Sequence, residues 1–221
     1  MTCLCLTRNR RQWLPQAIRC FQSQTYRNKE LLIIADGENV RDIVAGAQES
    51  DERVRLIEIP EGYRIGQKRN FGADQAAGEI IAHWDDDDFS APERLGDQVQ
   101  RLLASGKAVT AYCAMYFRAS RAITESEWWF YEGKPGRGIG TSLLYRKEWW
   151  RQHQFQAIQI QEDSHFMHAA AGAKEFVTAE AGTLMAATIH AGNTSKRNLN
   201  PETYRVAPEF AGVPGMEFPC G

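Results

Sequence analysis

The chain has 221 residues, of which 43% are hydrophobic and 24% are charged, a composition typical of a globular domain. Its net charge of −2 and isoelectric point near 6.2 argue against a general nucleic-acid-binding protein, which normally has a basic domain. No apolar stretch in the sequence approaches the ~20 residues that a transmembrane helix needs, so no transmembrane segment is expected.

The five cysteines are odd in number and show no Cys-x-x-Cys spacing. We therefore expect neither a disulfide framework nor a structural zinc site. The N-terminus shows no charged region followed by a cleavable apolar segment, so no secretory signal is expected. These features together predict a protein of the reducing cytoplasm.

Apolar runs and helical periodicities alternate through the first half of the chain. The expected strands are 2–6, 31–34, 54–59 and 79–82, and the expected helices are 12–24, 40–47, 64–77 and one that starts at 90–92. The continuous apolar run at 31–34 is typical of a strand that is buried on both faces. This alternation predicts an α/β fold with a doubly wound, mainly parallel sheet.

The pattern changes after Gly106. Strands are expected at 108–117, 141–145, 175–178 and 183–190, a helix at 162–171, and a dense aromatic run at 128–131. The last residues contain four prolines and are expected to form an extended tail. We therefore expect one continuous domain over residues 1–200, made of a first half at 1–105 and a second half at 106–200, with a tail at 201–221.

Four consecutive carboxylates, Asp85 to Asp88, follow the strand that ends near His83. They are expected at the carboxyl edge of the sheet, where open α/β folds bind ligands. Like charges this close raise one another's pKa unless a cation lies among them. Alternate side chains of an extended turn converge, so Asp85 and Asp87 form a candidate oxygen-ligand pair for Mg²⁺ or Mn²⁺. A solvated acidic turn is the alternative interpretation.

Six short motifs occur in order along the chain. They are Leu6–Arg10, Gln24–Tyr26, Leu32–Gly37, Gly66–Asn70, the segment from Gly78 through the carboxylates, and Glu162–Asp163. Together they resemble the family 2 glycosyltransferases with the GT-A fold, strongly over about residues 2–105 and more loosely over 140–195. The resemblance implies a Rossmann-like nucleotide-binding half at 1–105 and an acceptor-binding half at 106–200. No Gln-x-x-Arg-Trp motif of the processive polysaccharide synthases is present.

The resemblance also implies roles for individual residues. The nucleotide would be bound by Thr7, Arg8, Asp36, Lys68, Arg69, Asp85 and Asp86. Asp36 would accept a hydrogen bond from the base, for which uridine is favoured. The metal, Mn²⁺ or Mg²⁺, would be bound by Asp85, Asp87 and His190, although a histidine at a strand end is more often only hydrogen-bonded.

For the chemical step, the resemblance implies that Asp163 is the general base that deprotonates the acceptor. Asp163 acting as a helix cap, or Glu162 acting as the base, are the alternatives. Lys196 and Arg197 are candidates for extra positive charge near the phosphates. The aromatic run at 128–131 is a candidate stacking platform for a sugar acceptor, while a core strand or a subunit contact would explain it equally well.

The expected activity is a metal-dependent, inverting transfer of a sugar from a nucleotide-diphosphate sugar, with a UDP-sugar favoured, to an unidentified acceptor hydroxyl. Two alternatives come from other classes. One is a non-catalytic module that binds a nucleotide sugar or a metal, and the other is a GT-A-related nucleotidyltransferase. A nucleotidyltransferase would be expected to carry a Gly-rich phosphate loop near the first strand, and residues 7–10 contain no glycine.

Overall fold

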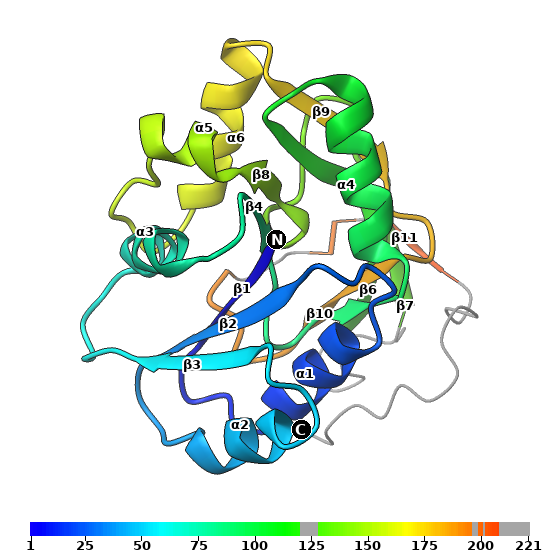
Figure 1. The fold of residues 1–221 in the computed structure, drawn as a ribbon. Coiled ribbons are helices and arrows are strands. Elements are labelled where there is room, and N and C mark those ends of the chain that lie inside the picture. The colour runs from blue at the N-terminus through cyan, green and yellow to red at the C-terminus, as the bar shows by residue number, and fades with distance from the viewer. Residues whose placement is uncertain (120–127, 196–198, 201, 208–221) are drawn as a thin grey trace.

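The computed structural model describes residues 1–119, 128–195, 199–200 and 202–207, and its first half alternates strands with helices (Figure 1). These elements are β1 (Thr2–Thr7), α1 (Leu14–Gln22), β2 (Glu30–Ala35), α2 (Arg41–Gln48), β3 (Val54–Glu58), α3 (Ile65–Gln75) and β4 (Ile80–His83). The four strands are parallel and lie in the order β3-β2-β1-β4. Every element predicted over this half is confirmed, with boundaries that shift by a few residues.

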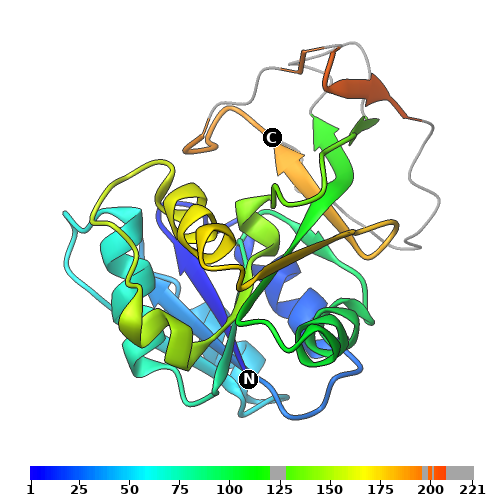
Figure 2. The same ribbon diagram turned by 90° about the horizontal axis from the view of Figure 1, so that it is seen from above.

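The second half is mixed rather than parallel. Its elements are β5 (Phe89–Ser90), α4 (Arg94–Ser105), β6 (Val109–Ala119), β7 (Trp128–Tyr131), the short 3₁₀ helix η1 (Gly140–Ser142), β8 (Leu144–Arg146), α5 (Lys147–Gln152), α6 (Glu162–Gly172), β9 (Phe176–Glu180), β10 (Met185–Ile189) and β11 (Tyr204–Val206). Strand β6 joins the two halves. Its start pairs with β8 and β9, and its end pairs with β7 and β10. Figure 2 shows β6 running from the first sheet into this second group of strands.

Side chains that alternate along the central strands create a core on each face of the sheet. In β1, Cys3 and Cys5 pack with apolar residues of α1, α2 and α4, whereas Leu4 packs with α3, α5 and α6. Figure 1 shows these two groups of helices on opposite sides of the sheet. Because successive side chains of a strand point to opposite faces, one apolar strand packs against helices on both sides of the sheet, as a doubly wound fold requires.

Two local predictions need correction, and one short helix was missed. Helix α4 begins at Arg94 and not at 90–92, because Phe89 and Ser90 form a short strand that pairs with β10. The strand expected at 141–145 is divided into η1 and the shorter β8. The short helix α5 was not predicted.

The expected tail contributes an ordered strand over the residues that the structure describes. Tyr204 to Val206 form β11, which pairs antiparallel with β7. Residues 201 and 208–221 lie outside the described residues. The four described cysteines, Cys3, Cys5, Cys20 and Cys113, are free and buried. Among the described residues, no helix has both the length and the apolar character needed to cross a lipid bilayer.

The order of the parallel strands determines where a ligand can bind. The chain passes from β1 to β2 and β3 on one side, then returns to place β4 on the other side of β1. A crevice opens at such a reversal, beyond the carboxyl ends of the strands. Thr7 ends β1, and the acidic run follows β4, so both belong to this edge.

Candidate active site

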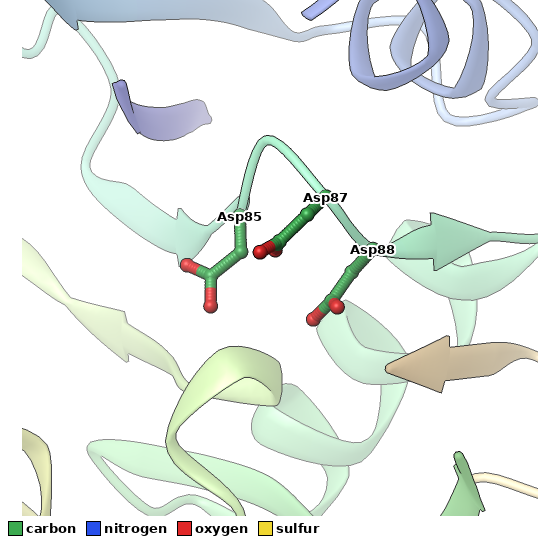
Figure 3. A group of neighbouring side chains, drawn as sticks. All are labelled: Asp85, Asp87 and Asp88. Atoms are coloured by element: carbon green, nitrogen blue, oxygen red, sulfur yellow. The ribbon is translucent and has the colours of Figure 1, made fainter. Parts of the chain in front are cut away.

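The four carboxylates lie on the turn between β4 and β5. Oxygen atoms of Asp85, Asp87 and Asp88 lie within 4.8 Å of one another, and Figure 3 shows their side chains on the same side of the turn. An all-oxygen donor set of this kind fits Mg²⁺ or Mn²⁺. The predicted pair, Asp85 and Asp87, is thus brought together, and Asp88 joins it.

The acidic cluster is electrostatically unfavourable without a cation. Burial, followed by repulsion from Asp87, raises the pKa of Asp86 to about 7 and that of Asp88 well above its usual range. Burial also raises the pKa of Asp85. Desolvation and like charges both oppose ionisation, and a divalent cation would relieve both effects.

Arg10 belongs to the Leu6–Arg10 motif, was given no role from the sequence, and supplies a countercharge to the acidic cluster. Its Nη1 lies 2.8 Å from Asp87 Oδ2 and 3.0 Å from Asp86 Oδ1, and its Nη2 donates to the Gly192 carbonyl at 2.6 Å. Arg10 therefore bridges Asp86 and Asp87, and Asp87 also converges with Asp85 and Asp88. The contact joins the segment after β1 to the segment after β10.

Asp87 is also contacted by the segment after β10. His190 Nε2 lies 2.9 Å from Asp87 Oδ2, and Asn193 Nδ2 donates to the same oxygen at 3.1 Å. The His190 ring stacks on Trp13 at a centroid distance of 4.8 Å. His190 thus lies beside the cluster in contact with Asp87, and its role as a metal ligand stays a prediction.

Asp88 is held by residues far away in the sequence. Its Oδ1 accepts a hydrogen bond from the Thr188 backbone N–H at 2.8 Å, and its Oδ2 accepts one from the Thr141 hydroxyl. These partners lie in β10 and η1. Only the folded chain reveals this orientation, which is why the sequence did not single out Asp88.

Buried residues of β4 and α4 support the turn. Arg94 donates to the His83 carbonyl at 2.9 Å and to Ser90 Oγ at 2.7 Å, and its guanidinium lies 5.0 Å from the Trp84 ring centroid. The His83 ring Nδ1 lies 2.9 Å from the Gly140 carbonyl, and burial holds the pKa of His83 well below its usual range. His83 is therefore neutral and fixes the position of Gly140.

Asp36 follows β2 and is enclosed by basic side chains. It forms an ion pair with Lys68, and Arg8 Nε lies 3.8 Å from its Oδ2. The Asp36 side chain is fully buried, whereas Lys68 and Arg8 line the cavity described below. A contact between Asp36 and the nucleobase of a donor would require Lys68 to move, so this contact stays a prediction.

Arg69 connects the acidic cluster to the start of α6. Its Nε donates to Glu162 Oε1 at 2.9 Å, and its Nη2 lies 3.9 Å from Asp85 Oδ1. Glu162 is buried, and this burial raises its pKa. Asp163 is less buried, and its Oδ1 accepts a hydrogen bond from the Ser164 N–H at 2.6 Å.

A cavity of about 690 Å³ unites these groups. The predicted residues that line it are Thr7, Arg8, Lys68, Arg69, Asp85, Asp86, Asp87, Glu162 and Asp163. Lys196 and Arg197 lie outside the described residues. The cavity thus has a cluster of carboxylates, several cations and a separate pair of acidic residues, the combination expected for a metal-bound diphosphate beside a general base.

Comparison with known proteins identifies the family. Residues 3–173 match the family model described as Glycosyl transferase family 2. The chain belongs to glycosyltransferase family 2. An uncharacterized glycosyltransferase of Haemophilus influenzae is 30% identical over 121 residues, which are 52% of this chain and 48% of that protein.

Solved structures agree on the GT-A fold. Staphylococcus aureus TarS in complex with UDP-GlcNAc superposes with a TM-score of 0.70 at 15% identity, over 91% of this chain and 62% of that one. The mannosyltransferase PcManGT of Pyrobaculum calidifontis, in complex with GDP-Man and Mn²⁺, gives a TM-score of 0.63 at 13% identity, over 85% and 56% of the two chains. This chain spans about half to two thirds of the length of each of these three proteins.

Proposed function

We propose that the chain is a metal-dependent, inverting glycosyltransferase that moves a sugar from a nucleotide-diphosphate sugar, UDP in particular, to an acceptor hydroxyl. The convergence of Asp85, Asp87 and Asp88 within 4.8 Å, in a cavity that is also lined by Arg69 and Asp163, carries this proposal. Family membership supports the transferase class. The manganese in the PcManGT complex supports the choice of metal.

The charged groups of the cavity suit a diphosphate leaving group. A divalent cation held by Asp85, Asp87 and Asp88 would neutralise the negative charge that grows on the diphosphate as the bond to the sugar breaks. Lys68 and Arg69 are buried, so their positive charges act in a medium of low dielectric and are screened little by solvent. Preorganised charges of this kind stabilise a transition state at little reorganisation cost.

Asp163 is the better candidate for the general base. The Glu162 carboxylate accepts a hydrogen bond from Arg69, and this ion pair fixes its orientation away from the role of a free base. Asp163 lines the cavity with one oxygen directed against Gly140. Gln161 occupies the cap position of α6, which argues against a capping role for Asp163. A base beside the acceptor hydroxyl, separate from the diphosphate site, favours a single displacement with inversion.

Two solved complexes of related folds bear on the identity of the nucleotide. TarS is described with UDP-GlcNAc and PcManGT with GDP-Man, so related folds accommodate either base. Asp36 lies behind Lys68 at the carboxyl edge of β2 and is the candidate acceptor of a hydrogen bond from the base. We further propose that residues 1–105 bind the donor and 106–200 bind the acceptor within one domain.

A panel of nucleotide sugars tests the proposal without knowledge of the acceptor. We expect slow hydrolysis of one UDP-sugar with Mn²⁺, abolished by a chelator and by Asp87→Asn. Asp74→Asn serves as a matched control, because Asp74 is an exposed carboxylate on α3 outside the cavity lining. Tight nucleotide binding with no turnover for any donor or acceptor would favour the non-catalytic module instead.

A further inference from the structure

Three aromatic rings from three strands line one part of the cavity. They are Phe117 of β6, Tyr131 of β7 and Tyr204 of β11. The ring centroids of Tyr131 and Tyr204 lie 5.1 Å apart, and Phe117 lies 6.3 Å from Tyr131 and 5.4 Å from Tyr204. These three residues, here called the aromatic wall, therefore form one contiguous apolar surface.

The strand register explains which aromatic residues belong to the wall. Successive side chains of β7 point to opposite faces. Trp129 and Tyr131 therefore pack with Phe117. Trp128 and Phe130 pack instead in the core that contains α1, α2 and α4. Tyr204 is the direct partner of Tyr131 in the antiparallel pair of β11 and β7. Of the aromatic run at 128–131, only Tyr131 lines the cavity. The candidate stacking surface thus includes one residue of the run, Tyr131, together with Tyr204 of the C-terminal segment.

Among the described residues, those that line the cavity in the apolar cluster of the aromatic wall are uncharged. Ile139, Ala187 and Ile189 line the cavity and belong to the same apolar cluster as Phe117 and Tyr204. The charged residues of the cavity come from other elements, namely the segment after β1, the start of α3, the turn after β4 and the start of α6. This part of the cavity therefore favours a neutral group over a phosphate or a carboxylate.

The aromatic wall and the proposed base line the same cavity and are linked through two adjacent residues. Ile139 packs in the apolar cluster of the wall, and the next residue, Gly140, lies against the Asp163 carboxylate. A ring bound on the wall would therefore share the cavity with the Asp163 carboxylate. Aromatic faces suit the apolar face of a pyranose ring, whose hydroxyls remain free at its edge.

We propose that the acceptor is a neutral sugar whose ring stacks on Tyr131 and Tyr204. This inference rests on the proposed function and adds the chemical class of the acceptor and the residues that select it. Tyr131 is the principal specificity-determining residue, because it lines the cavity and is more exposed than Tyr204.

Saturation-transfer difference NMR on the full chain, with UDP and Mn²⁺ present, tests the subsite. The probes are the methyl glycosides of glucose, galactose, mannose and N-acetylglucosamine, with glycerol 3-phosphate as an anionic probe. We expect at least one glycoside, and not glycerol 3-phosphate, to receive saturation. Tyr131→Leu keeps apolar bulk but removes the flat ring, and should weaken that glycoside about fivefold. Phe130→Leu is the matched control, because Phe130 is the neighbour on the opposite face of β7.

The affinity for UDP with Mn²⁺, measured on each variant, separates the two proposals. Equal glycoside binding by wild type and Tyr131→Leu, or binding of glycerol 3-phosphate alone, would overturn the neutral-sugar subsite. A glycoside signal that depends on Tyr131 supports the subsite even if UDP fails to bind. Failure of UDP to bind the wild type with Mn²⁺ would instead contradict the proposed function.

Discussion

The Asp163 carboxylate lies directly against the α-carbon of Gly140, so that a β-carbon placed on Gly140 would overlap Asp163 Oδ2. The Gly140 carbonyl is fixed in turn by His83, the last residue of β4. The strand that leads into the acidic cluster therefore also sets the position of the proposed base. The absence of a side chain at position 140 is a geometric requirement of the site.

Gly140→Ala should displace the base and slow the transfer. Misplacement of a catalytic group by about 1 Å can cost ~10²-fold in rate, and we expect a loss of turnover of that order. The affinity for UDP and Mn²⁺ should change little, because position 140 faces Asp163. Steady-state kinetics and calorimetry measure the two effects. Gly46→Ala in α2 is the matched control, since a β-carbon there meets nothing within 4 Å.

Asp163→Asn and Glu162→Gln should have different effects. Loss of a general base typically costs ~10²–10⁴-fold, so Asp163→Asn should lose turnover on that scale while it keeps nucleotide affinity. Glu162→Gln leaves the buried Arg69 without its carboxylate partner, so its main effect should be a loss of stability of ~1–3 kcal/mol. Kinetics and chemical denaturation distinguish them. The product's anomeric configuration, read by NMR, should be inverted, and retention would remove Asp163 from this role.

Binding of Mn²⁺ should stabilise the fold through the acidic cluster. At a concentration of 100 times its dissociation constant, a ligand that binds only the native state contributes about 2.7 kcal/mol. For a chain of this size that corresponds to a rise in Tm of roughly 5–10 °C. Asp85→Asn should abolish the rise, yet leave the metal-free protein at least as stable, because it removes one of several like charges that lie within 4.8 Å of one another. A full Mn²⁺-dependent shift in Asp85→Asn would show that the metal binds elsewhere.

Much of the site was predictable because it depends on local sequence. The apolar runs of β1 to β4 identify the sheet, and the carboxyl ends of these strands place Thr7, Asp36 and the acidic run along one edge. Parallel strands make this inference general, since their ends coincide in space. Glu162 and Asp163 likewise begin α6, as the pattern indicated.

The rest depends on contacts between segments that are distant in the sequence. Asp88 is oriented by Thr141 and Thr188, and Arg10 reaches Asp86 across 76 positions. The burial of Asp36 behind Lys68 and the pairing of Tyr204 with Tyr131 are also long-range relationships. No local periodicity encodes such contacts, so only the folded chain reveals them.

Asp36→Ala tests whether Asp36 binds the nucleobase of the donor. Loss of a charged hydrogen-bond partner typically costs ~1.5–3 kcal/mol, so we expect UDP to bind about 10- to 100-fold more weakly. The variant also frees Lys68, so inorganic pyrophosphate serves as a probe that lacks the base. The affinity for pyrophosphate should not fall, because pyrophosphate lacks the nucleobase and Lys68 remains present. Unchanged affinity for UDP would show that Asp36 serves only as the partner of Lys68.

The most direct test of the central claim is titration calorimetry of UDP into the wild-type chain, with Mn²⁺ and then with a chelator. A diphosphate site built on Asp85, Asp87 and Asp88 predicts affinity that is more than about tenfold higher with Mn²⁺, a difference of at least ~1.4 kcal/mol. Asp87→Asn should abolish the difference, and Asp74→Asn should retain it. Equal affinity for UDP with Mn²⁺ and with chelator in the wild type would contradict the account.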